Sequence, residues 1–303
     1  MDLVARMERL PKPGETVSGE FFQTISGGKG ANQAVAAARL GARVSMIGRV
    51  GDDTFGVTLR KNLNSAGVDT NHVLDTPGVS SGVALIGVEQ SGANAITVVP
   101  AANGRLTADD VRSFQDMIAT ASALIVQLET PIETVAAAIQ IAQKNGVLTV
   151  LDPAPAPNEP LPRELMNVDI ISPNQSEAEA LTGVAVVDWE SAKLAAQAIR
   201  KQGANAVVLK MGALGALVHA QDDSIHQFAA CKVLEGEIVD TTAAGDAFTA
   251  ALTVALCEGQ SLKDAAQFGS LAGTFACTRF GAQPAMPTRD ELKVWAEAHT
   301  AAQ

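Results

Sequence analysis

The sequence of 303 residues contains no tyrosine, and aromatic residues make up only 4% of it. So few large rings argue against an aromatic-rich binding sandwich, whereas 26 glycines and many alanines favour helices packed closely on a sheet. The three cysteines, Cys231, Cys257 and Cys277, are an odd number without a CxxC pair, which excludes a disulfide framework and a zinc-site pattern. Unpaired thiols are typical of a reducing compartment, so we expect a cytoplasmic protein.

The sequence also lacks an excess of basic residues and a long apolar run. Its 22 Lys and Arg against 33 Asp and Glu give a net charge of −11, which leaves no basic face for nucleic acid. No apolar run approaches the roughly 18 residues that a membrane span needs. The N-terminus carries charges where a signal peptide has its apolar core. We therefore expect neither nucleic acid nor a membrane as a partner.

Apolar, β-branched runs alternate with alanine-rich helical patterns over most of the chain. This alternation predicts an α/β fold, a doubly wound and mostly parallel sheet flanked by helices, in a single domain over residues 1–303. Ligands of such folds bind beyond the carboxyl ends of the strands. The predicted strands cover residues 44–50, 83–88, 95–99, 124–128, 148–151, 170–171, 207–210 and 217–219. The predicted helices cover residues 31–40, 55–65, 132–144, 188–201, 246–258, 262–277 and 289–298.

Two segments interrupt the alternation. Residues from about 3 to 25 consist of short extended pieces, and residues 80–99 contain two strands joined by a loop too short for a crossover helix. We expect these two segments to pair in a small antiparallel β lid outside the main sheet.

Common catalytic patterns are missing or out of context. There is no GxxxxGK[ST] phosphate loop, and residues 26–32 fail the dinucleotide fingerprint GxGxxG because Gln33 holds its last position. A nicotinamide-dependent oxidoreductase is therefore poorly supported. Residues 78–82 match GxSxG but precede a strand, whereas a nucleophile elbow lies between a strand and a helix. The four histidines form no i, i+4 pair.

The strongest local signal is the run Asp-Thr-Thr-Ala-Ala-Gly-Asp at residues 240–246, which precedes a helical pattern. Small residues at 243–245 allow a tight turn into the helix, whose first amides and positive dipole end form an anion site. Asp246 would face the bound anion. From this stretch alone, an Asp that merely caps the helix is the alternative.

Further polar groups fall at predicted strand ends and helix starts. Glycines at 27, 28 and 30 permit close approach of a ligand, with Lys29 and Asn32 as hydrogen-bond donors. Asn174 and Glu177 suit phosphate and water-bound magnesium, although a capping box explains the same spacing. Glu129 ends a predicted strand, and the turn at 210–215 follows another one.

Together these motifs resemble the ribokinase family of carbohydrate kinases from end to end. Residues 13–16 and 27–33 match the first family signature, and residues 241–246 match the second. Residues 81–85, 152–155, 173–179 and 278–284 fit as well. The resemblance implies a ribokinase-like fold and ATP-dependent transfer of a phosphoryl group to the 5-hydroxyl of D-ribose, which gives D-ribose 5-phosphate.

The resemblance also implies roles for individual residues. Asp246 is the expected catalytic base, and the amides of Ala243, Ala244 and Gly245 form the anion hole. The expected sugar ligands are Asp2, Gly28, Lys29, Gly30, Ala31, Asn32, Glu129 and Asp246. The expected ATP contacts are Asn174, Lys210, Met211, Gly212, Ala213, Leu214, Gly215, Gly245 and Ser270. Glu177 would act on Mg²⁺ through water, and K⁺ would lie at Asp240, Thr242, Ala276, Arg279, Gly281 and Ala285.

The chain departs from the family pattern at its start. Members begin with a buried apolar strand that ends in Gly-Ser-x-Asn, and this sequence starts at the Met-Asp that follows it. We therefore expect the first core strand to be missing, through a misassigned start codon or a true truncation. Lys210 stands where Thr is frequent, and Leu214 where a basic residue is common.

Two alternatives to ribose phosphorylation stay open. One is a kinase for another small sugar, 2-deoxyribose or a ketose. The other is an inactive, N-terminally truncated paralogue that only binds. Related kinases are often dimers, so we expect a homodimer that pairs through the lid.

Overall fold

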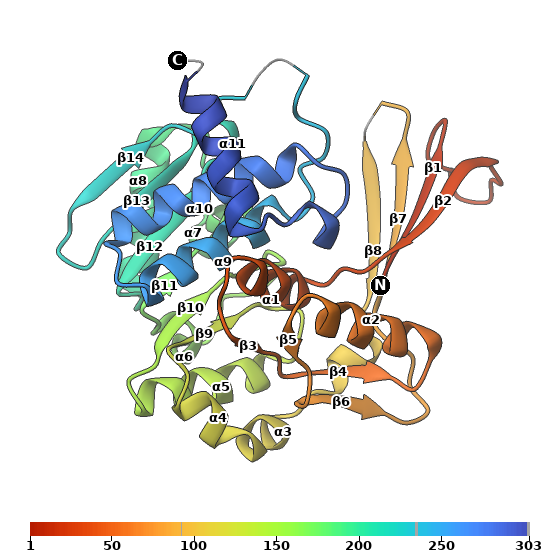
Figure 1. Cartoon of the computed structure of the whole chain (residues 1–303), viewed down its shortest axis with the longest axis horizontal. Helices are drawn as coiled ribbons and strands as arrows, with labels where there is room; N and C mark the ends of the chain where they lie inside the picture. The colour runs from red at the N-terminus through yellow and green to blue at the C-terminus, as the bar shows by residue number, and fades with distance from the viewer. Residues whose placement is uncertain (92, 234–235, 302–303) are drawn as a thin grey trace.

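A computed structural model describes residues 1–91, 93–233 and 236–301, so Gly92 of the predicted lid lies outside the described residues. A six-stranded sheet in the order β14-β13-β12-β11-β10-β9 forms the centre of the molecule (Figure 1). Its parallel part joins β9 (Ala123–Val126), β10 (Leu148–Leu151), β11 (Ile170–Ile171) and β12 (Ala206–Lys210). The strands β13 (Ala216–His219) and β14 (Ile225–Phe228) add antiparallel neighbours. The predicted α/β fold with a mostly parallel sheet is confirmed.

The central strands are apolar at nearly every position because helices cover both faces of the sheet. Successive residues of β12 point to opposite faces. Val207 and Leu209 pack with α5 (Ile132–Lys144) and α8 (Trp189–Gln202). Val208 packs with α9 (Ala244–Cys257) and α10 (Leu262–Cys277) on the other face.

The remaining helices surround this core. Several of them end at the glycines expected to stop them; Gly41 and Gly146 have φ of 98° and 70°, a backbone conformation that favours glycine. Within the described ranges, none of the helices is both long and apolar enough to cross a bilayer. The remaining helices are α1 (Lys29–Arg39), α2 (Thr54–Ser65), α3 (Ala108–Ser113), α4 (Gln115–Ala119), α6 (Arg163–Met166), α7 (Gln175–Thr182) and α11 (Arg289–Ala301), with the 3₁₀ turns η1 (Ala101–Arg105), η2 (Gly212–Leu214) and η3 (Gln283–Ala285).

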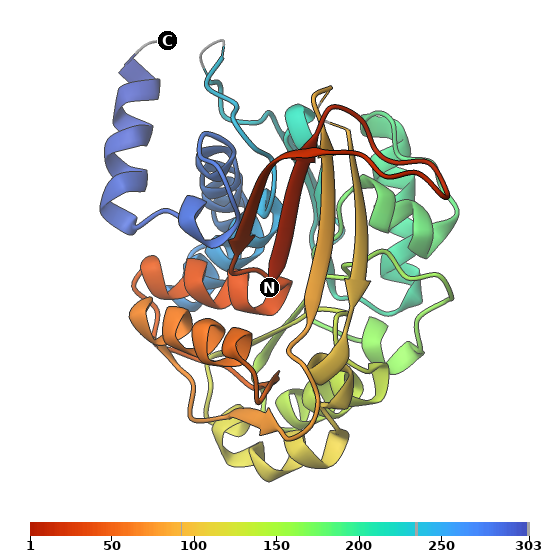
Figure 2. The same ribbon diagram turned by 90° about the vertical axis from the view of Figure 1, so that its right-hand side faces the viewer.

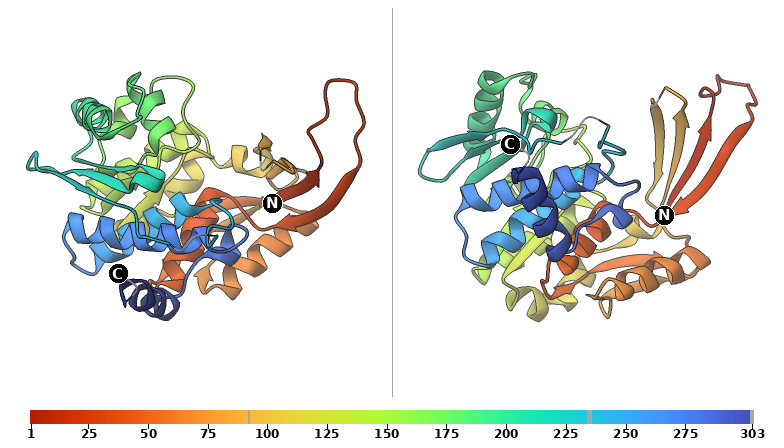
Figure 3. Two further views of the ribbon diagram at one scale, coloured as in Figure 1. Left: turned by 90° about the horizontal axis from the view of Figure 1, so that it is seen from above. Right: turned by 45° about the horizontal axis from the view of Figure 1, so that its top comes forward.

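A second sheet, which we call the outer sheet, stands away from the body (Figures 1 and 3) and is seen in front of it in Figure 2. Its order is β2-β1-β7-β8, from β1 (Asp2–Met7), β2 (Gly19–Ile25), β7 (Val83–Glu89) and β8 (Asn94–Val99). The pairs β1-β2 and β7-β8 are antiparallel, but β1 and β7 are parallel, which differs from the prediction. The amino group of Met1 donates to the carbonyl of Gly82 at 2.8 Å, so both strands leave the body side by side and in the same direction.

The single strand predicted over residues 44–50 is wrong. Two strands replace it, β3 (Val44–Ser45) and β4 (Gly48–Gly51). β3 pairs in parallel with β5 (Val68–Asp69), whereas β4 pairs in parallel with β6 (Val73–Thr76). The segment is broken because its two halves have different partners, which an apolar run cannot indicate.

A cavity of about 1050 Å³ separates these two short ladders from the central sheet. It is lined by β9, by residues 44–50 and by apolar side chains such as Leu63 and Val111, and it reaches Met1 and Glu129 at one end. Among the described strands, β9 pairs with β10 alone. Within the described part of the chain, the central sheet therefore ends at β9, beside this cavity.

Candidate active site

Asp246 lies in the first turn of α9 and is 4% exposed. Its two carboxylate oxygens accept hydrogen bonds from α1, one from Asn32 Nδ2 at 2.9 Å and one from Gln33 Nε2 at 3.1 Å. Burial raises the pKa of Asp246 to about 6; the Asp152 carboxylate adds to the rise, and Lys29 with the two amide hydrogen bonds opposes it. Such a carboxylate is ionised at neutral pH and can still take up a proton.

The turn ahead of Asp246 contains the predicted anion hole. Ala243 precedes the helix with φ of 59°, which turns the chain sharply into α9. The Ala244 amide contacts the Thr241 carbonyl at 3.3 Å, and Gly245 follows it in the first helical turn. Amides of a first turn have no carbonyl partner within their own helix and can bind an anion beyond the helix end, although the Ala244 amide already donates to Thr241.

The predicted sugar ligands come together on one side of Asp246. The backbone amide of Lys29 donates to Glu129 Oε2 at 2.8 Å. A Cβ on Gly27 would lie 2.2 Å from a carboxylate oxygen of Asp2, and a Cβ on Gly28 would lie 3.9 Å from Glu129 Oε2. The glycine run therefore lets β1, α1 and the loop after β9 approach one another. Ala31, another predicted sugar ligand, is buried in α1.

The charged groups among the predicted sugar ligands shift one another's pKa values. Burial lowers the pKa of Lys29, but Asp246, Asp152, Glu129 and Glu177 outweigh it, and the net shift is upward. Burial raises the pKa of Asp2, with the N-terminal ammonium opposing and Glu129 adding to the rise. Asn32 Oδ1 is buried and has no hydrogen-bond partner among the described residues. An acceptor of this kind is matched by a ligand hydroxyl.

The predicted nucleotide residues lie on the other side of Asp246, at the ends of β11 and β12. Lys210 is buried, and its amide donates to the Pro173 carbonyl at 2.8 Å. A Cβ on Gly245 would lie 3.5 Å from Lys210 Nζ, which brings β12 next to the anion-hole turn. Met211 is buried, whereas Ala213 and Leu214 are exposed in η2, which Gly215 closes with φ of 109°. Ser270 is buried on α10. Burial raises the pKa of the nearby Cys231 thiol, and a hydrogen bond with the Ser270 side chain opposes this rise.

Asn174 and Glu177 form the capping box that was the alternative explanation of their spacing. Asn174 begins α7, and its side chain accepts from the Glu177 amide at 2.9 Å. The Glu177 carboxylate accepts from the backbone and side-chain nitrogens of Asn174 at 2.7 and 2.9 Å. Burial raises the pKa of Glu177, and nearby Lys210 opposes the rise. Each oxygen keeps a free lone pair, so the box does not preclude a contact with a metal-bound water.

The residues expected at a potassium site also gather in one place. The Asp240 carboxylate accepts from the amides of Thr242 and Gly281, each at 2.9 Å. The Arg279 amide contacts the Ala276 carbonyl at 3.2 Å, and Ala285 ends η3 a few residues later. Over residues 1–91, 93–233 and 236–301, no group of three or more His, Cys, Asp or Glu is placed to hold a metal ion. Any cation here would therefore be bound mainly by backbone carbonyls.

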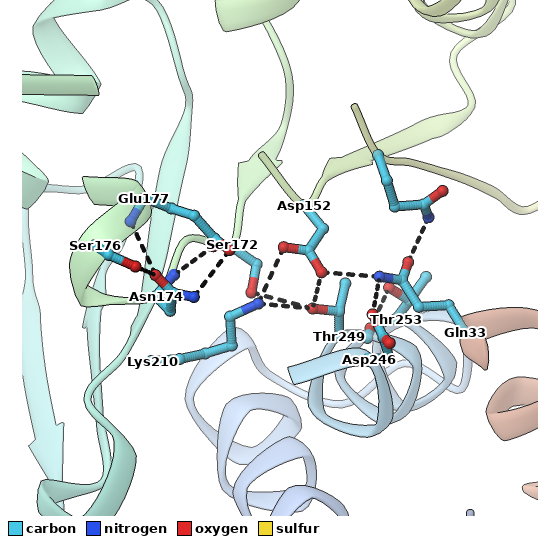
Figure 4. Close-up of polar contacts among 11 residues, drawn as sticks. Gln33, Asp152, Ser172, Asn174, Ser176, Glu177, Lys210, Asp246, Thr249 and Thr253 are labelled. Atoms are coloured by element: carbon cyan, nitrogen blue, oxygen red, sulfur yellow. Dashed lines mark hydrogen bonds and ion pairs between the residues drawn. The ribbon is translucent and has the colours of Figure 1, made fainter. Parts of the chain in front are cut away.

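Two residues of the site, Gln33 and Asp152, were not among the predicted site residues. Gln33 Nε2 donates to Asp152 Oδ2 at 2.8 Å as well as to Asp246, and Asp152 Oδ1 lies 3.1 Å from Lys210 Nζ (Figure 4). Asp152 directly follows β10 at the carboxyl edge of the parallel sheet, the signal that had singled out Glu129. Gln33 belongs to a matched motif, but its identity alone does not indicate which groups it contacts.

A family model described as the pfkB family carbohydrate kinase matches residues 1–289 of the chain. The chain belongs to this kinase family. The kinase is therefore a phosphotransferase, as predicted from its motifs, and its α/β fold is that of ribokinase structures.

Individual relatives agree over nearly the whole kinase. A ribokinase of Haemophilus influenzae is 42% identical over 294 residues, which cover 96% of this chain and 93% of that protein. A deoxyribokinase of Salmonella typhi is 35% identical over 292 residues and covers 96% and 94% of the two chains. The structure of Arabidopsis thaliana ribokinase complexed with ribose and ATP matches with a TM-score of 0.88 and 32% identity, covering 97% of this chain and 94% of that one.

Proposed function

We propose that this kinase transfers the γ-phosphoryl group of ATP to the 5-hydroxyl of D-ribose and releases D-ribose 5-phosphate. The observation that carries the proposal is the position of Asp246, between the predicted sugar ligands and the turn at residues 243–245. The relatives named ribokinase, and the matching structure described with ribose and ATP, support ribose as the acceptor.

The chemistry follows from the placement of these groups. Asp2, Asn32 and Glu129 offer acceptors, and Lys29 offers a donor, for the hydroxyls of a small polyol. A hydroxyl next to Asp246 gives up its proton to the carboxylate as its oxygen attacks the γ-phosphorus. The first-turn amides of α9 and its positive dipole end stabilise the charge that develops on the phosphoryl oxygens. Positioning and charge stabilisation are the main requirements of phosphoryl transfer.

We propose Mg²⁺ and K⁺ as cofactors. Oxygen ligands suit both ions, and Glu177 has lone pairs left to accept from a magnesium-bound water. Mg²⁺ supplies charge neutralisation for the ATP phosphates. For K⁺, the Asp240 carboxylate and the carbonyls around Ala276 and Gly281 are hard oxygen donors next to the anion-hole turn.

We further propose a cytoplasmic homodimer that pairs through the outer sheet. Asp2 shares one face of that sheet with Ile86 and Ile96, because cross-strand partners and alternate residues point the same way. Since the Asp2 carboxylate lies against Gly27, among the predicted sugar ligands, this face covers the site. Phe22 and Leu85, 65% and 47% exposed, lie on the opposite face and offer an apolar surface to a second copy. The three free cysteines agree with a reducing compartment.

The test is ADP release by the 303-residue chain with MgATP and KCl, using D-ribose, 2-deoxyribose or fructose as acceptor. We expect the highest kcat/KM with ribose and a phosphorus NMR signal of the 5-phosphate. A higher kcat/KM with 2-deoxyribose would favour the activity named for the Salmonella relative. No turnover with any sugar would favour the inactive paralogue. Replacing KCl by NaCl at equal ionic strength should lower the rate, and equal rates would contradict the potassium site.

A further inference from the structure

Gln33 holds a fixed orientation between two carboxylates. It is 1% exposed, and Nε2 uses both of its N–H groups, on Asp152 Oδ2 at 2.8 Å and on Asp246 Oδ1 at 3.1 Å. Its carbonyl oxygen accepts a hydrogen bond from the Gln127 side chain. A flipped amide would place an oxygen against both carboxylates, so only one orientation satisfies the site.

Asp152 is a buried carboxylate that accepts from the same amide nitrogen as Asp246. It is 1% exposed, and its second oxygen lies 3.1 Å from Lys210 Nζ. Thr249 Oγ1 lies 3.4 Å from both Lys210 Nζ and Asp152 Oδ2 (Figure 4). A buried carboxylate is costly unless it is paired and hydrogen-bonded, and here both conditions hold. A line of contacts thus runs from β12 through the loop after β10 to α1 and α9.

We propose that Gln33 and Asp152 are positioning residues for the base Asp246. Gln33 holds the Asp246 carboxylate in one direction. Asp152, which is paired with Lys210, holds Gln33 and places a second negative charge near the base. The inference rests on the proposed role of Asp246. With Asn32 holding the second oxygen, neither carboxylate oxygen of Asp246 turns freely. The base therefore meets the acceptor hydroxyl in one defined orientation, which favours proton transfer.

The charged groups around Asp246 come from five elements. Lys29 lies on α1, Asp152 follows β10, Glu129 follows β9, Glu177 lies on α7 and Lys210 ends β12. Asp152 is the carboxylate that raises the pKa of Asp246 by repulsion, whereas the Gln33 hydrogen bond lowers it. Removing one or the other should therefore shift the pKa of the base in opposite directions.

The experiment measures kcat/KM for ribose against pH, with saturating MgATP, in the wild type and in Asp152→Asn and Gln33→Met variants. The acid limb of this profile is the fall in kcat/KM at low pH, where the base becomes protonated. In Asp152→Asn we expect it to move to lower pH by on the order of one pH unit, because a neighbouring negative charge is lost. In Gln33→Met we expect it to move up, because the ionised base loses a hydrogen bond. Gln33→Met changes no charge, so it keeps the test informative if Asp152→Asn, which leaves Lys210 unpaired, fails to fold.

Thr253→Val is the matched control. Thr253 is buried on α9 and its hydroxyl donates to the Thr249 carbonyl, so the variant alters the same helix without touching Asp246. Its acid limb should match that of the wild type. Lowered kcat with an unmoved acid limb in both site variants would mean a purely structural network and would overturn the inference. A wild type without turnover would instead contradict the proposed function.

Discussion

Asp246 shows how strongly the behaviour of one residue depends on its surroundings. In the sequence it is an acid after a small-residue turn, equally suited to cap a helix. In the structure no capping contact is needed to explain it, because its oxygens face the amides of Asn32 and Gln33 from α1. Its burial and its neighbours suit it to the role of base that we propose for it.

Replacing Asp246 by Asn should remove turnover and spare binding. Asn keeps the shape of the side chain but accepts no proton, so we expect kcat to fall by about 10²–10⁴-fold. Ribose and ATP affinities, measured by calorimetry, should stay within a few-fold of the wild type. Near-normal kcat in this variant would remove Asp246 from its role.

The same variant should not be less stable at neutral pH. The folded-state pKa of Asp246 is about 6, above the usual 3.8 of an aspartate, so the folded protein binds more protons between these values and loses stability as the pH rises through them. Thermal unfolding at pH 7.5 should therefore give Asp246→Asn a midpoint at or above that of the wild type. A clearly lower midpoint would contradict the raised pKa.

At the scale of elements, the start of α9 depends on close packing against α10. A Cβ on Gly273 would lie 3.0 Å from the Ala244 carbonyl, and one on Gly269 would lie 2.9 Å from the Phe248 carbonyl. These glycines let the two helices touch along their backbones, just behind the anion-hole turn. Helix packing and catalytic geometry are therefore coupled at this contact.

Gly273→Ala should disturb both stability and turnover. The added methyl group must displace the first turn of α9, a strain that we expect to cost about 1–3 kcal/mol. Urea unfolding and steady-state kinetics would show a lower midpoint and a lower kcat. Gln267→Ala, on the exposed side of α10, is the control and should change neither quantity. Wild-type values for Gly273→Ala would show that the contact is loose.

At the scale of the whole molecule, the outer sheet has one face for the site and one for a partner. The double variant Phe22→Ser, Leu85→Ser removes apolar surface from the face opposite Asp2. We expect sedimentation analysis to show a dimer for the wild type and a monomer for the double variant. Ile96→Ser, on the face that carries Asp2, is the control and should remain dimeric. A wild type that sediments as a monomer would contradict the proposed dimer.

The cavity beside β9 makes a second prediction at this scale. An apolar, β-branched segment of about five residues, the usual length of a strand, joined ahead of Met1 can pair with the free edge of β9 and fill the cavity. We expect it to raise the thermal midpoint by roughly 2 °C or more, since about 1 kcal/mol has an effect of that size in a protein of this length. A Gly-Ser extension of equal length should not. Equal midpoints for the two extensions would show that the cavity does not accept a strand.

Much of the fold was accessible from the sequence because its signals are local. Helices over 132–144 and 262–277 were predicted to the residue, since an amphipathic pattern and a terminal glycine or cap are written into neighbouring residues. The strand over 44–50 was not, because its two halves separate according to partners that lie at residues 68–76. The pairing of the two lid segments was predicted, but the parallel direction of β1 and β7 was not, since that direction depends on Met1 lying beside Gly82.

The candidate site likewise has features that depend on a short stretch of sequence and features that depend on long-range contacts. The alternation of strands and helices, the small-residue turn before Asp246 and the glycines of residues 27–30 could be identified from the residues alone, because each of these is a property of a short stretch of chain. The contacts of Gln33 with Asp246 and Asp152, and the pairing of Asp152 with Lys210, depend on the folded chain. These contacts join residues up to 213 positions apart, and the pKa of a buried carboxylate depends on which charges the fold brings near it.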